Sequence, residues 1–141
     1  FLLHNLYMEE QQQILELWIP SLSKSNAKLW FSTLSNEVRL GEKVQNTRGL
    51  VTKALSNTLD HWSETPKGRV ALVILLDQLP RFLNIGTPDI FAGDNKAYDL
   101  VHEFVFSEEA KSLPLVYQFF LLEPFFHSDD STVLTKGANH L

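Results

Sequence analysis

The longest unbroken apolar run in the sequence is the feature that most constrains its fold. Residues 70–76 read Val-Ala-Leu-Val-Ile-Leu-Leu, a pattern typical of either a buried parallel strand or a helix buried on every side. Thr65 is a good N-cap and Pro66 suits the first position of a helix. Pro80 disfavours helical geometry in the residue before it. The run therefore predicts a buried helix that begins after Thr65 and ends at Pro80.

Apolar residues at helical spacing predict further helices on both sides of this segment. We expect helices over residues 9–19, 27–34, 36–62 with a break near 45–49, one turn at 88–92, and 115–122. Asp94 is expected to cap another helix, residues 107–112 to form a charged break, and Glu123-Pro124 to end helix 115–122. Ser128 is expected to cap a last helix. Since no period-two run or Asn-Gly hairpin indicates strands, the prediction is an all-α, multi-helix domain with segments 70–79 and 115–122 buried at its centre.

Length and composition exclude several classes of protein. A chain of 141 residues with 44% hydrophobic and 21% charged residues suits one globular domain, which we expect to span residues 1–141. The formal net charge is -5 and the basic residues are scattered, which argues against nucleic-acid binding. The absence of cysteine excludes disulfides and thiolate metal sites. No apolar run approaches the ~20 residues that span a bilayer, so we expect a soluble, cytoplasmic protein.

An ordered set of short motifs runs through the second half of the sequence. The motifs are Leu75-Leu76-Asp77-Gln78-Leu79-Pro80-Arg81, then Gly86-Thr87-Pro88, Phe91-Ala92 and Asp94, and finally Pro124-Phe125-Phe126-His127-Ser128-Asp129. This ordered set resembles the uncharacterised family known as domain of unknown function 924. Two positions depart from the family pattern. Phe82 occupies a position where the family has asparagine, and Asp129 one where it has glutamate. The family's Arg-Phe-Gly-Arg-Phe-Pro-His segment is missing, which suggests a truncated or divergent member. The resemblance implies a helical array similar to tetratricopeptide repeats.

The candidate site residues lie in these motifs. The catalytic candidates are Asp77, Arg81, Asp94 and His127, and the ligand-binding candidates are Gln78, Arg81, His127, Ser128 and Asp129. We expect the charged ones to converge at one end of the bundle, because both apolar helices are predicted to finish just before them. An aspartate in the last turn of a helix faces the negative end of the macrodipole. Asp77 therefore requires a donor, and Arg81 is the nearest in sequence.

Several functions are compatible with this cluster. The first hypothesis is a groove that binds a peptide or a small anionic ligand, held by Arg81. The second is a small hydrolase-like enzyme, in which His127 acts with Asp77, Asp94 or Asp129. In a third, the apolar face is a homo-oligomer interface, and the same polar residues serve only as helix caps and an ion pair. We expect no cofactor and no metal site, because His-x-Asp is a weak ligand spacing.

Overall fold

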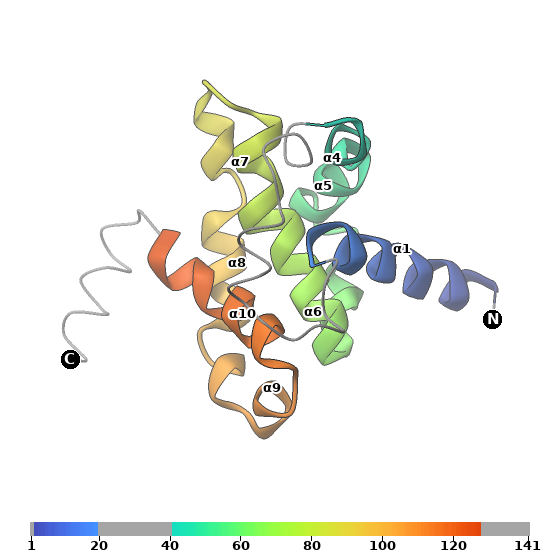
Figure 1. Ribbon diagram of the computed structural model, residues 1–141, viewed down its shortest axis with the longest axis vertical. Coiled ribbons are helices and arrows are strands. Elements are labelled where there is room, and N and C mark those ends of the chain that lie inside the picture. The colour runs from blue at the N-terminus through green and yellow to red at the C-terminus, as the bar shows by residue number, and fades with distance from the viewer. Residues whose placement is uncertain (1, 20–40, 128–141) are drawn as a thin grey trace.

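The computed structural model describes residues 2–19 and 41–127, and all regular structure within these ranges is helical (Figure 1). The helices are α1 Leu2–Trp18, α4 Glu42–Gln45, α5 Arg48–Leu55, η2 Asp60–Glu64, α6 Pro66–Val73, η3 Ile74–Gln78, α7 Leu79–Leu83, η4 Pro88–Phe91, α8 Asp94–Val101, η5 Phe104–Phe106, α9 Glu108–Lys111 and α10 Leu115–His127. The prediction of an all-α fold is therefore confirmed for the described part of the chain.

The predicted buried helix forms the axis of the molecule. Helices α6, η3 and α7 follow one another without a break, and Figure 1 shows them as one rod with the other helices around it. Helices α1, α8 and α10 pack against α6, and α5 packs against η3. Every residue from 70 to 77 is fully buried. As predicted, Thr65 caps the rod, its side chain accepting a hydrogen bond of 3.0 Å from the Gly68 amide.

The prediction that Pro80 ends this helix was wrong, because α7 continues to Leu83. A proline inside an α-helix removes one hydrogen bond, and its ring clashes with the carbonyl four residues earlier, here that of Leu76. The rod avoids this clash by widening just before the proline. Residues Ile74–Gln78 form a turn of π-helix, in which the Leu79 amide bonds the Ile74 carbonyl five residues back.

The expected end of the last apolar helix at Glu123-Pro124 was also wrong. Helix α10 runs through Pro124 as far as His127, and the Pro124 ring is buried. The burial of α10 is one-sided. Tyr117, Phe120 and Leu121 are buried, whereas the Leu115 side chain is 82% exposed. Of the two segments predicted to be buried at the centre, only the one in the rod is buried throughout its apolar run.

Most of the remaining helix predictions agree with the structure. Helix α1 covers the segment predicted at 9–19 as far as Trp18, α4 and α5 are separate as expected, and η4 provides the turn near residue 88. The long helix predicted to reach residue 62 stops at Leu55, and Asn57 then adopts a left-handed φ of 70°. The predicted charged break at 107–112 contains α9, capped by Ser107. The predictions for residues 27–34 and for a helix after Ser128 lie outside the described residues.

Of the helices in the described ranges, none combines the length and the apolar character that a bilayer span requires.

Candidate functional site

The site is built around Asp77, which lies in the π-helical turn of the rod and is completely buried. Its Oδ2 accepts hydrogen bonds from Gln78 Nε2 and from His127 Nδ1, both of 2.8 Å. Its Oδ1 has no hydrogen-bond partner among the described residues, and Arg81 Nη1 is 3.9 Å away. A buried carboxylate is costly unless it is paired, so the His127 contact is central to how the fold accepts Asp77.

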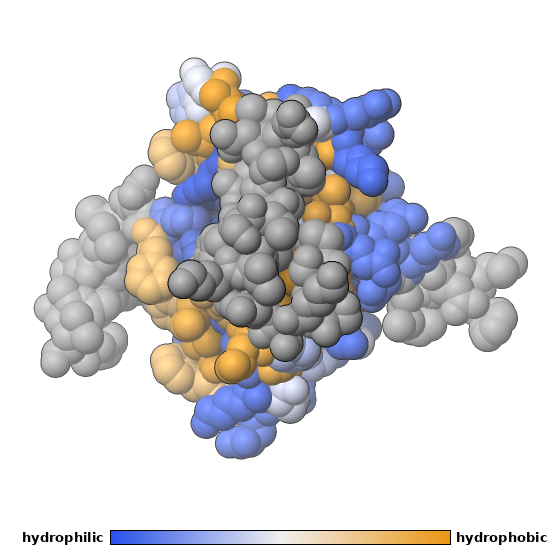
Figure 2. Space-filling model, in the orientation of Figure 1, coloured by the Kyte–Doolittle hydropathy of each residue, from blue (hydrophilic) through white to orange (hydrophobic). Residues whose placement is uncertain are grey.

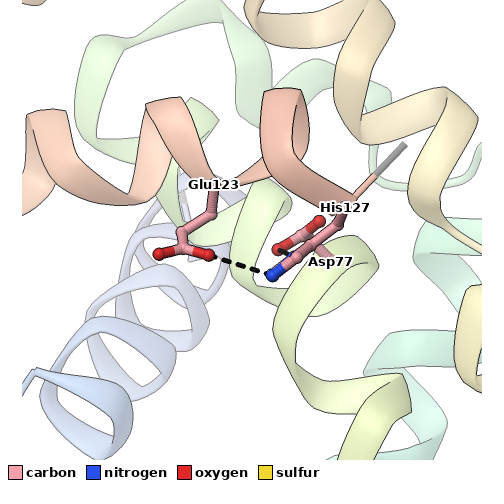
Figure 3. Close-up of side chains that lie close together, drawn as sticks. All are labelled: Asp77, Glu123 and His127. Carbon is pink, nitrogen blue, oxygen red and sulfur yellow. Dashed lines mark hydrogen bonds and ion pairs between the residues drawn. The ribbon is translucent and has the colours of Figure 1, made fainter. Parts of the chain in front are cut away.

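Helix α10 brings two side chains to this carboxylate. Glu123 and His127 are four residues apart, so they share one face of the helix. His127 Nε2 lies 3.0 Å from Glu123 Oε2. Figure 3 shows the imidazole between the carboxylates of Asp77 and Glu123, and each ring nitrogen faces a carboxylate oxygen. The Glu123 side chain is 18% exposed and that of His127 is 26% exposed, so solvent reaches this side of the cluster.

The surroundings alter the proton affinity of both α10 side chains. The hydrogen bond to Asp77 raises the pKa of His127, an effect that exceeds the opposing effect of burial. Burial raises the pKa of Glu123, although the nearby His127 charge works in the other direction. A protonated imidazole can donate to both carboxylates at once. The arrangement therefore holds a proton between His127 and Glu123.

A second ion pair lies beside the first. Arg81 binds Asp94 with both ends of its guanidinium, Nη1 to Oδ1 at 2.8 Å and Nη2 to Oδ2 at 2.9 Å. Arg81 Nη1 also donates to the backbone carbonyl of Asp77. Burial raises the pKa of Asp94 despite the Arg81 hydrogen bonds. The main carboxylate partner of Arg81 is thus Asp94, whereas the donors to the Asp77 carboxylate are Gln78 and His127.

The expectation that Asp94 caps a helix was wrong. The N-cap of α8 is Gly93, and no side chain caps this end. Gly93 is packed so closely against the rod that a Cβ there would lie 2.1 Å from the Leu76 carbonyl oxygen. This close approach brings the first turn of α8 to Arg81. Asp94 is therefore used for pairing across the fold.

The structure brings together the charged candidates Asp77, Arg81, Asp94 and His127, as predicted, and Gln78 joins them through its bond to Asp77. Ser128 and Asp129 lie outside the described residues. Sequence reasoning missed Glu123, because it ended the helix at Glu123-Pro124. If α10 had been continued through the proline, the Glu-x-x-x-His spacing would have placed Glu123 and His127 on one face.

The cluster has the chemical groups for acid–base work or for metal binding. Asp77, Glu123 and His127 each offer one ligand atom, and these atoms lie within 4.8 Å of one another. The expectation of no metal site rested on the weak His-x-Asp spacing, on the lack of a second histidine four residues on and on the lack of cysteine, and it did not include this set of three. Arg81, by contrast, has its guanidinium engaged by Asp94 and by the Asp77 carbonyl.

Comparison with known proteins identifies the family. Residues 14–140 match the family described as "Bacterial protein of unknown function (DUF924)". The chain belongs to this family. The DUF924 member also matches a structure of the protein of unknown function ATU0120 from Agrobacterium tumefaciens, with a TM-score of 0.72 and 23% sequence identity. That match covers 94% of this chain and 72% of the other, and it shows a shared fold. No curated protein matches the sequence.

Proposed function

We propose that this DUF924 member is a hydrolase-like enzyme whose active site is the cluster of Asp77, Glu123 and His127. The observation that carries the proposal is the position of His127, whose two ring nitrogens lie 2.8 Å from Asp77 and 3.0 Å from Glu123. A buried carboxylate that orients an imidazole, beside a partly exposed group that exchanges protons, is a recurrent design of catalytic sites. Acid–base groups with perturbed pKa values occur preferentially at functional sites.

The roles follow from burial and hydrogen bonding. Asp77 is fully buried and holds Nδ1 of His127, so it orients the ring and stabilises its protonated form. Glu123 is the general base. Its carboxylate takes a proton from a water molecule as the water oxygen attacks a carbonyl or phosphoryl centre. As the bond to the leaving group breaks, the His127 imidazolium gives that group a proton. Glu123 then passes its proton back to Nε2 of His127, 3.0 Å away.

The charges of the site favour this proposal over the clamping of an anion. Arg81, the cation on which an anionic ligand would depend, already makes a bidentate pair with Asp94. If Arg81 left that pair to bind an anion, the Asp94 carboxylate, which is only 4% exposed, would lose its partner. We therefore assign Arg81 and Asp94 a positioning role beside the reacting groups.

Two other hypotheses stay as proposals, each with its own supporting observation. A cavity of about 320 Å³ between α1 and the α4–α5 region includes Lys43 in its lining, which would suit a small anionic ligand with an apolar body. Peptide binding by a tetratricopeptide-like array is a related possibility. Homo-oligomerisation is supported by the exposed apolar side chains of α10, which are Leu115, Leu122 and Phe126. Figure 2 shows hydrophobic residues at the surface over α10.

A panel of chromogenic carboxylic and phosphoric esters tests the proposed function. We expect the wild type to hydrolyse at least one member, and Glu123→Gln and Asp77→Asn to lower kcat/KM by about 10²–10⁴-fold. The matched control is His102→Ala, because His102 also faces a glutamate, Glu103 at 3.7 Å, but on an exposed surface. Turnover that survives in both active-site variants, or no turnover of any ester by the wild type, would contradict the proposal.

A further inference from the structure

The spacing of two atoms in the active-site cluster matches that of neighbouring ligands on a metal ion. His127 Nε2 and Glu123 Oε2 lie 3.0 Å apart and both belong to α10. Transition metals bind imidazole nitrogen and carboxylate oxygen at about 2.0–2.2 Å. Two such ligands at a right angle to each other are therefore separated by roughly 3.0 Å. This distance is compatible either with a proton shared by the two atoms or with a cation bound to both.

The partner of the second ring nitrogen supports a cation. A histidine that binds a metal commonly donates its other N–H to a carboxylate, which fixes the tautomer and the ring orientation. Asp77 Oδ2 provides that carboxylate, 2.8 Å from Nδ1 of His127. With the proton held on Nδ1, the lone pair of Nε2 points toward Glu123. Figure 3 shows the His127 ring close to the carboxylates of both Asp77 and Glu123.

A separate observation is the surplus of negative charge around the site. The buried Asp77 Oδ1 makes no hydrogen bond within the described residues, and Arg81 Nη1 lies 3.9 Å from it. The same guanidinium also pairs with Asp94, while Glu123 pairs with His127. Three carboxylates and one guanidinium therefore leave a formal charge of -2 when His127 is neutral. A divalent cation would compensate this charge.

We infer that Glu123 and His127 bind a divalent transition-metal ion, with Asp77 as the group that orients His127. The imidazole ligand favours Zn²⁺, the carboxylate ligand suits Mn²⁺, and Mg²⁺ and Ca²⁺ prefer oxygen ligands alone. The inference rests on the proposed function in that it assigns the same hydrolytic site. The ion would take the place of the proton shared by His127 and Glu123, so with the ion bound these two side chains would be its ligands and no longer the acid and the base. The ion would then supply the activated water in place of Glu123.

Calorimetric titration of chelator-treated protein with Zn²⁺ and with Mn²⁺ tests this inference. The expected result is binding of one ion per chain, with release of protons that is measured by repeating the titration in buffers of different ionisation enthalpy. We expect Glu123→Gln and His127→Ala to weaken binding at least about tenfold, and Asp77→Asn to weaken it about 10–100-fold. His102→Ala, which alters the exposed His102–Glu103 pair, should leave the affinity unchanged.

The outcomes separate the cation from the proposed chemistry. If the wild type binds neither ion at millimolar concentration, or binds both as tightly after Glu123→Gln as before, the cation inference is wrong. Circular dichroism in chelator shows whether each variant is folded. Of the three substitutions, Glu123→Gln should disturb the core least, because Glu123 is only half-buried. If the wild type binds no metal but still hydrolyses an ester in chelator, the proposed function stands and the cation inference is wrong. If it binds metal but hydrolyses no ester, the cation inference stands and the proposed function is wrong.

Discussion

At the scale of single residues, Asp77 decides how the site is built. It is the only carboxylate among the described residues that is 0% exposed, and its partners come from different places in the chain. Gln78 is its neighbour, whereas His127 is 50 residues away. The sequence predicted that Asp77 is important, because an aspartate after seven apolar residues must find donors. It did not predict which residue would supply them, because proximity in sequence pointed to Arg81.

The Arg81–Asp94 pair makes a prediction about stability. Arg81→Ala should lower the free energy of unfolding by about 3 kcal/mol, because it leaves the buried Asp94 carboxylate and the Asp77 carbonyl without their donor. Urea unfolding followed by circular dichroism measures the change. As a matched control, Lys111→Ala removes an exposed pair with Glu108 at 3.6 Å and should cost less than about 1 kcal/mol. Equal midpoints for the two variants would show that the Arg81 pair contributes little.

At the scale of helices, the two prolines explain what the sequence could and could not predict. The existence of most helices followed from apolar spacing and from caps such as Thr65. Their ends did not, because Pro80 and Pro124 both lie inside helices. A proline stops a helix when nothing accommodates it, and here a π-helical turn precedes Pro80 while the Pro124 ring is buried. The sequence alone reports neither feature, and this is why Glu123 was missed.

The contact of α8 with the rod also makes a prediction. Gly93→Ala should destabilise the fold by about 1–3 kcal/mol, because its Cβ would lie 2.1 Å from the Leu76 carbonyl oxygen and backbone would have to move. Gly49→Ala is the control, since a Cβ at Gly49 meets nothing within 4 Å and lies in helix α5. It should stabilise the protein by up to about 1 kcal/mol. Thermal unfolding of both variants checks this, and a neutral Gly93→Ala would argue against the close approach.

At the scale of the whole molecule, the site couples the central rod to α10. The rod contributes Asp77 and Arg81, α8 contributes Asp94, and α10 contributes Glu123 and His127 (Figure 1). The short motifs through which the sequence resembles the family lie mostly in the segments that meet at this point. Their convergence supports the proposed site.

Coupling through His127 gives the stability of the molecule a defined dependence on pH. Because the folded state raises the pKa of His127, it binds this proton more tightly than the unfolded chain does, where the pKa is about 6.5. The resulting stabilisation is fully present below about pH 6.5 and is lost as the pH rises through the raised folded pKa. His127→Ala should remove this decline, and urea unfolding at a series of pH values measures it. If the free energy of unfolding of His127→Ala declines by the same amount as the pH rises, the decline is caused by other groups.

The most direct test of the Asp77–His127–Glu123 arrangement is an NMR titration of the His127 ring with isotope-labelled histidine, in metal-free buffer. We predict a pKa for His127 above the ordinary histidine value of about 6.5, and a lower pKa after Asp77→Asn, which removes the charge that accepts the Nδ1 hydrogen bond. If His127 titrates at its ordinary value in the wild type, or is unaffected by Asp77→Asn, the two residues do not form the pair on which the proposed site depends.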